Sequence, residues 1–180
     1  MPLPLNDPLL ELGLFFIAGH LMKVADRNPS RTEASWGMVA GAGSGLILAV
    51  LMSVRPSFST VVLAILAGSM LTGKVDCPAH WTGLGALVAG VLLWGVAPPA
   101  VITLLVLAVA ATMDEVGDEA AESSGRGMKR GWVLKLRPFL KLTAVGAAIW
   151  ALLPWQGAWA VLAFDSGYTV AEIEPRGRTL

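Results

Sequence analysis

The sequence predicts an all-α protein, a polytopic membrane helix bundle, on the strength of three observations. Of its 180 residues, 55% are hydrophobic and only 14% are charged, whereas about a quarter of the residues of a soluble domain are charged. The mean hydropathy is +0.67. Long windows contain no charged residue, which is the pattern of helices that cross a bilayer. We therefore expect one integral membrane domain over residues 1–180, multi-pass, in the cell membrane.

Seven apolar segments are the predicted helices. The first ends in a polar loop where Ser30 and Glu33 have the spacing of a capping box, which indicates that a new helix begins there. The second segment is about 19 residues long and carries no charge, so it is the clearest span. The segments are residues 9–25, 36–54, 60–72, 81–96, 100–113, 139–153 and 157–173.

The later segments are separated by residues that end or turn helices. Proline lacks a backbone N–H and does not continue a helix, and glycine commonly follows a helix end. The fifth segment runs without a break into the acidic stretch Asp114–Glu119, so its helix is expected to end in carboxylates. The breaks are Arg55 to Ser59, Gly73 to His80, Ala97 to Pro99, the loop Ser123 to Pro138, and Pro154.

The distribution of basic residues predicts the topology. Several segments are shorter than the ~20 residues of a perpendicular span, so five spans with fused or re-entrant pairs also have to be considered. Seven alternating spans place twelve of the thirteen Lys and Arg residues on one side, leaving only Arg55 on the other. The positive-inside rule predicts such a bias for cytoplasmic loops. We therefore expect seven short transmembrane helices, an outside N-terminus, a cytoplasmic C-terminus, a cytoplasmic basic loop at about 120–138 and a polar tail at about 172–180.

Tryptophan and glycine patterns agree with a compact bundle. Gly37, Gly41 and Gly45 form two overlapping Gly-x-x-x-Gly steps, which permit close approach of another helix. An oligomer contact through the same three glycines is possible. Tryptophan is typical of membrane interfaces, and six of the seven tryptophans fall near predicted segment ends: Trp36, Trp81, Trp94, Trp150, Trp155 and Trp159.

The composition also excludes several classes of function. Thirteen basic residues balance thirteen acidic ones, so net charge indicates no nucleic-acid partner. The single cysteine, Cys77, excludes an intramolecular disulfide and a zinc site built from cysteines. Two histidines, His20 and His80, are too few for a metal centre built from histidine alone.

Ionisable residues gather on the predicted cytoplasmic side, because the odd-numbered segments all end there. An ionisable side chain in the hydrocarbon costs roughly 2.5–3.5 kcal/mol, so such residues indicate a functional site by default. The sequence therefore predicts a polar, acid-rich site at this membrane face. Its members are His20, Lys23, Asp26, Lys74, Asp76, His80, Asp114, Glu115, Asp118, Glu119, Asp165 and Tyr168.

The acidic stretch predicts a metal site. Asp114 and Asp118 are four residues apart and share one helix face, where their charges repel unless a cation lies between them. Mg²⁺ binds through one or two carboxylates, water and phosphate oxygens, and Asp76 is a candidate third ligand. A solvated helix end is the alternative. The Asp-x-x-x-Asp spacing resembles one of the two aspartate-rich motifs of intramembrane prenyltransferases, but the second motif is absent and the chain is far too short.

The remaining site residues have predicted roles in catalysis and substrate binding. His80 is a candidate general acid or base, because histidine is the residue type that most often transfers protons near neutral pH. Asp165 lies in mid-segment and needs a basic partner, for which Lys23, Lys74 and Lys141 are candidates. The expected catalytic residues are Lys74, Asp76, His80 and Asp165, and the expected substrate-binding residues are Lys23, Arg137, Lys141 and Tyr168.

Three functions are compatible with this site. The first is a Mg²⁺-dependent enzyme that acts on a lipid- or prenyl-linked phosphate at the cytoplasmic membrane face. The second is a cation or proton transporter or channel, which needs polar residues through the whole membrane depth. The third is an assembly subunit of a membrane complex, whose acids would point outward to solvent. The sequence leaves open whether the protein is an enzyme.

Overall fold

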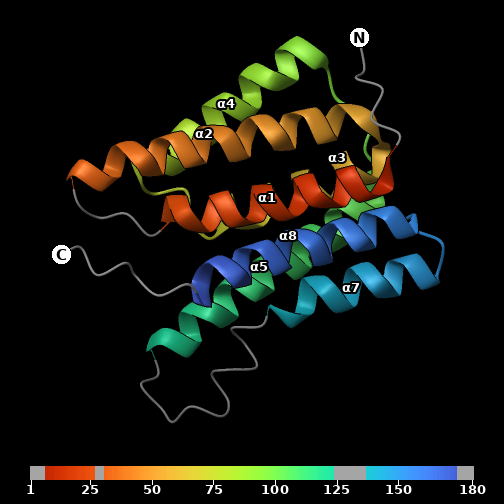
Figure 1. Cartoon of the computed structure of the whole chain (residues 1–180). Helices are drawn as coiled ribbons and strands as arrows, with labels where there is room; N and C mark the ends of the chain where they lie inside the picture. The colour runs from red at the N-terminus through yellow and green to blue at the C-terminus, as the bar shows by residue number, and fades with distance from the viewer. Residues whose placement is uncertain (1–6, 27–30, 124–136, 174–180) are drawn as a thin grey trace.

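The computed structural model describes residues 7–26, 31–123 and 137–173, and in this part of the chain all regular structure is α-helical. The all-α prediction is confirmed. Figure 1 shows the helices lying side by side as a bundle. They are α1 (Pro8–Asp26), α2 (Arg31–Val54), α3 (Pro56–Leu71), α4 (Pro78–Trp94), α5 (Val101–Ser123), α7 (Pro138–Ile149) and α8 (Trp155–Ile173).

Proline and glycine set several helix boundaries. Pro56, Pro78 and Pro138 each occupy the first turn of a helix, where the missing N–H costs no hydrogen bond. The predicted turn after Arg55 is therefore shorter than expected, and α3 begins at Pro56. Gly73 and Gly95 follow the ends of α3 and α4 with φ of 72° and 80°, a conformation that glycine adopts readily.

Successive helices run in opposite directions, so helices that are two apart in chain order run parallel (Figure 1). The most extensive contacts join α2 to α4, α1 to α8 and α3 to α5. As a result α1, α3, α5 and α8 all end at one end of the bundle, where α2, α4 and α7 begin. We call this the polar end. The alternation of apolar segments in the sequence predicts that these helix ends meet.

Glycine allows the parallel helices α2 and α4 to pack backbone to backbone. A Cβ atom on Gly41 or Gly45 would collide with the carbonyl oxygens of Ala79 and Gly83 in α4. The predicted close approach along the glycine face of α2 is therefore confirmed for these two positions. Because α4 covers this face within the chain, Gly41 and Gly45 do not offer a free surface to a second copy.

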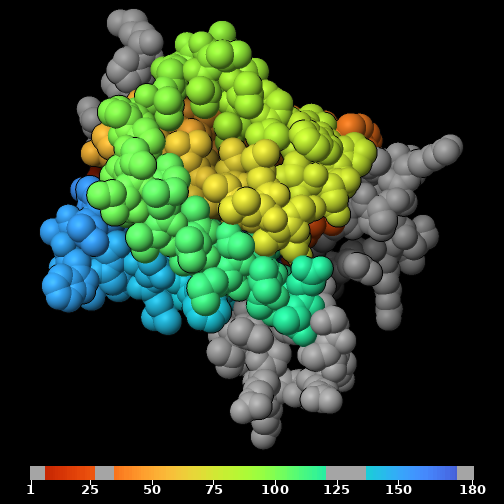
Figure 2. Space-filling model, turned by 180° about the vertical axis from the view of Figure 1, so that it is seen from behind, coloured from red at the N-terminus to blue at the C-terminus, as the bar shows by residue number. Residues whose placement is uncertain are grey.

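The helices α3 and α4 do not contact each other in the described part of the chain, although they are consecutive in sequence. Among the described helices, α4 contacts α2 and, weakly, α1. The bundle is therefore open along its side between α3 and α4. Figure 2 views this side, and the surface is hollowed between α4 and α3.

Large apolar side chains cover the outside of the bundle. On α5 they form a stripe at helical spacing, with Ile102, Leu105 and Val109 being 77%, 59% and 62% exposed. Similarly exposed residues lie on α4, where Leu92 is 81% exposed, and on α7, where Leu142 is 71% exposed. Large exposed apolar patches are typical of surfaces that contact a membrane or another protein.

Two described helices are long and apolar enough to cross a membrane. They are α1 and residues 35–54 of α2, with mean hydropathies of 1.4 and 1.9. The helices α3, α4 and α7 are apolar but have only 16, 17 and 12 residues. At 1.5 Å per residue, α7 is about 18 Å long, less than the ≈ 30 Å hydrocarbon core. The structure favours membrane association through α1 and α2. That all seven helices span the membrane stays a prediction.

Candidate functional site

A cavity of about 280 Å³ lies at the polar end of the bundle, on the side where α3 and α4 are apart. Six of the seven described helices contribute residues to its wall, and Arg137, which immediately precedes α7, completes it. Its inner wall is apolar and includes Leu48, Val62, Ile65, Leu66, Leu87 and Phe164. Its polar wall consists of Lys23, Asp26, Lys74, His80, Glu115, Asp118, Arg137 and Tyr168, together with Ser69.

Arg137 is held in this wall by one carboxylate and one aromatic ring. Its Nη2 donates a 2.7 Å hydrogen bond to Oε1 of Glu115, and its guanidinium lies 4.6 Å from the ring centre of Tyr168. Burial acts to lower the pKa of Arg137, but Tyr168, Glu115 and Asp118 outweigh it and raise that pKa above its usual value. The guanidinium therefore stays charged. The second oxygen of Glu115, Oε2, is buried and has no hydrogen-bond partner among the described residues.

Lys23 contacts the same aromatic ring as Arg137, that of Tyr168. Its Nζ is 4.5 Å from the ring centre of Tyr168 and donates a 3.3 Å hydrogen bond to the Tyr168 hydroxyl. That hydroxyl donates in turn to Oδ2 of Asp26, at 3.2 Å. Two cations on one ring are favourable through cation–π attraction. Tyr168 thus positions Lys23 and Arg137 beside each other at the cavity, although it lies in a different helix from either.

The basic partner of Asp165 is Lys141. Lys141 Nζ lies 2.6 Å from Oδ2 of Asp165, so the partner is one of the three lysines that the sequence suggests. Both residues line a second, smaller cavity of about 30 Å³, together with Asp114. They do not line the larger cavity. The ion pair between Lys141 and Asp165 therefore links α7 to α8.

Asp114 caps the start of α7. Its two carboxylate oxygens accept hydrogen bonds from the backbone N–H groups of Phe139 and Leu140, at 2.9 and 2.7 Å, and the residue is only 3% exposed. Free N–H groups at a helix N-terminus favour a carboxylate. This role is not visible in the sequence, because the capping residue precedes the helix by more than 20 positions.

Replacing Asp114 with Asn should therefore destabilise the fold. The amide has one acceptor oxygen, so one charge-assisted hydrogen bond is lost, and a donor group is placed against the helix N-terminus. We expect the free energy of unfolding to fall by about 2 kcal/mol, measured by denaturant unfolding in detergent. Glu119→Gln, an exposed acid on the same helix, is the control and should change stability by less than about 0.5 kcal/mol. Equal stability of the two variants would contradict the capping role.

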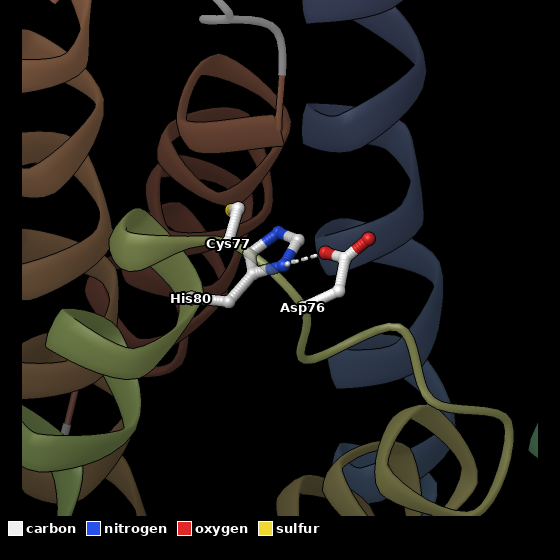
Figure 3. A group of neighbouring side chains, drawn as sticks. All are labelled: Asp76, Cys77 and His80. Atoms are coloured by element: carbon white, nitrogen blue, oxygen red, sulfur yellow. Dashed lines mark ion pairs between the residues drawn. The ribbon is translucent and has the colours of Figure 1, made fainter.

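The three residues predicted to bind Mg²⁺ are not gathered at one point. Asp118 lines the larger cavity and Asp114 the smaller one, while the Asp76 side chain is 74% exposed. Among the described residues, one group of three potential ligands lies close enough to share an ion, and it consists of Asp76, Cys77 and His80 (Figure 3). Sequence reasoning missed this group because it judged cysteine and histidine separately, each as too few.

Comparisons with protein-family models, with curated proteins and with solved structures find no match. The geometry therefore carries the functional argument. Of the residues predicted from the sequence, the larger cavity brings together Lys23, Lys74, His80, Asp118, Arg137 and Tyr168. The smaller cavity contains Asp114, Lys141 and Asp165, and Asp76 lines neither.

Proposed function

We propose that this chain is a multi-pass integral membrane protein of the cell membrane whose polar end faces the cytoplasm. Exposed apolar residues on α4, α5 and α7 support this, since a bilayer would cover them. Exposed tryptophans support it as well, because Trp36 and Trp81 lie at the polar end whereas Trp150, Trp155 and Trp159 lie at the opposite end. Two such levels are typical of the two membrane interfaces. The shorter helices α3 and α7 are embedded beside α5.

We further propose that the larger cavity binds a lipid- or prenyl-linked phosphate. One observation carries this: an apolar inner wall meets three cations, Lys23, Lys74 and Arg137, in one cavity. The apolar wall suits a hydrocarbon chain, and the cations suit a phosphate at the membrane surface. The open side between α3 and α4 would let a lipid enter from the bilayer without crossing water.

The proposed activity is an enzymatic reaction at that phosphate. Lys23, Lys74 and Arg137 would stabilise negative charge that develops on its oxygens, which is commonly the largest contribution to phosphate chemistry. His80 lines the same cavity and would lie beside the bound phosphate. Glu115 and Asp118 would hold Mg²⁺ together with phosphate oxygens and water, and the buried, unpartnered Oε2 of Glu115 fits that role. The metal would supply Lewis-acid stabilisation when bound.

The other two functions have less support. The ion pair of Glu11 with Arg55 lies at the opposite end of the bundle and does not line the cavity, so this cavity does not extend to the charged groups at that end. An assembly subunit would present its acids to solvent, whereas Asp114 and Glu115 are 3% and 7% exposed. Both features favour ligand binding inside the bundle.

Titration calorimetry tests the proposal with farnesyl monophosphate and farnesol as ligands for the purified protein in detergent. We expect the phosphate to bind at least tenfold more tightly than the alcohol. Lys74→Gln and Arg137→Gln should each weaken phosphate binding by about tenfold to a hundredfold, because a hydrogen bond to a charged group is worth about 1.5–3 kcal/mol. Binding of the alcohol should not change.

Arg137→Lys, which keeps the charge, and Leu92→Ala, on the outer surface, are the matched controls. Arg137→Lys should retain more affinity than Arg137→Gln, and Leu92→Ala should bind as the wild type does. Equal affinity for the phosphate and the alcohol, or wild-type affinity in both glutamine variants, would overturn the proposal.

A further inference from the structure

We propose that Asp76, Cys77 and His80 form a binding site for a thiophilic divalent cation of the zinc type. The three residues stand at the start of α4, and one ligand atom from each lies within 4.8 Å of the others. Figure 3 shows the imidazole of His80 between the carboxylate of Asp76 and the side chain of Cys77. Thiolate, imidazole and carboxylate together suit Zn²⁺, whereas Mg²⁺ takes oxygen ligands.

The spacing of His80 and Asp76 fits a tetrahedral ion. His80 Nδ1 and Asp76 Oδ1 are 3.4 Å apart. That is too long for a good hydrogen bond, whose N···O distance is about 2.7–3.2 Å. Zinc bonds of about 2.0–2.2 Å at the tetrahedral angle put a nitrogen and an oxygen ligand about 3.4 Å apart. The separation of these two atoms in the His80–Asp76 ion pair therefore matches the edge of a zinc tetrahedron.

His80 also has the surroundings of a metal ligand. Its Nδ1 is buried and makes no hydrogen bond to the described residues, which is costly for a polar atom unless something binds it. Its Nε2 faces Oδ1 of Asp26 at 3.7 Å. A ligating histidine commonly directs its second nitrogen to a carboxylate that fixes the ring. Asp26 is itself held by the hydroxyl of Tyr168, so the ring is oriented from the side away from Asp76.

Three protein ligands leave one position of a tetrahedral ion open, as in catalytic zinc sites. His80 lines the larger cavity, so the site adjoins the place proposed for the phosphate. The site does not depend on the proposed function, because the three ligands and Asp26 are sufficient to bind the metal alone.

Cobalt substitution tests the site directly in the full-length protein. After treatment with a chelator, the purified chain is titrated with Co²⁺, whose thiolate complexes absorb in the near ultraviolet. We expect one Co²⁺ per chain, a thiolate charge-transfer band, and displacement by equimolar Zn²⁺ but not by excess Mg²⁺. Because Cys77 is the only cysteine, any such band reports this residue.

Variants separate the ligands from their support. Cys77→Ser should abolish the thiolate band, and Asp26→Asn should keep the band but weaken Co²⁺ binding by about tenfold to a hundredfold. Glu119→Gln, an exposed acid outside the group, should bind as the wild type does. Circular dichroism confirms that each variant is folded.

Alkylation of Cys77 by iodoacetamide supplies a second readout that needs no spectroscopic metal. Zn²⁺ should slow alkylation in the wild type and not in His80→Gln. Bound Co²⁺ without a thiolate band, or alkylation that Zn²⁺ leaves unchanged in the wild type, would overturn the site.

Discussion

Replacing Arg55 with Ala should lower the free energy of unfolding by about 3–5 kcal/mol, because the change leaves a buried carboxylate without its partner. Glu11 is 1% exposed. Its Oε1 accepts a 2.9 Å hydrogen bond from Arg55 Nε, and Nη2 of the same guanidinium is also 2.9 Å away. The pair joins α1 to the connection between α2 and α3. The loss should be measured by denaturant unfolding in detergent.

The double variant Glu11→Leu/Arg55→Met is the control for this prediction. Replacing both members of a buried pair with apolar residues of similar volume is often neutral or stabilising. We therefore expect the double variant to recover most of the stability lost in Arg55→Ala. If Arg55→Ala unfolds at the wild-type denaturant concentration, the pair does not contribute to the fold in the way described.

Replacing Gly167 with Ala should cost about 3 kcal/mol, the upper end of the usual range for overpacking. A Cβ at this position would overlap the carbonyl oxygen of Phe16, and one on Gly19 would overlap that of Phe164. In both cases the obstacle is backbone, so the parallel helices α1 and α8 have to move apart. Their separation would also pull Lys23 away from Tyr168, so phosphate binding should weaken together with stability.

Gly13→Ala is the control, because Gly13 lies in α1, the helix against which Gly167 packs, and a Cβ there meets nothing within 4 Å. Alanine is the better helix former by up to about 1 kcal/mol, so this variant should be as stable as the wild type or more so. A similar loss of stability in Gly13→Ala and Gly167→Ala would mean that α1 and α8 do not depend on close backbone contact.

The helices could be predicted from the sequence because their determinants are local. Apolar runs, the prolines at the starts of α3, α4 and α7, and the glycines after α3 and α4 are all visible in the printed sequence. Alternation of short segments also predicts that Lys23, His80 and Tyr168 meet at one end. By contrast, the opening between α3 and α4 was not predictable, since these helices are apolar on all sides and show no face that indicates their neighbours.

The side-chain contacts of the site could be predicted only in part. Asp165 was expected to pair with a lysine, but only the tertiary packing selects Lys141. The capping role of Asp114 depends on a helix that begins more than 20 residues later, so spacing within the acidic stretch indicates a metal site instead. The Asp76, Cys77 and His80 group was missed for a different reason. Its residues lie within five positions of the sequence, but counting cysteine and histidine separately does not reveal a metal site that combines different residue types.

Native mass spectrometry of the protein extracted from membranes tests the central claim most directly, because it identifies the lipid that the cavity retains. We predict one phosphate-bearing lipid per chain in the wild type. Leu84→Trp, which fills the cavity, and the double variant Lys74→Gln/Arg137→Gln should both lose it, while Leu92→Ala should retain it. A wild-type protein that carries only uncharged lipids, or equal retention of the phosphate lipid in all four proteins, would contradict the account.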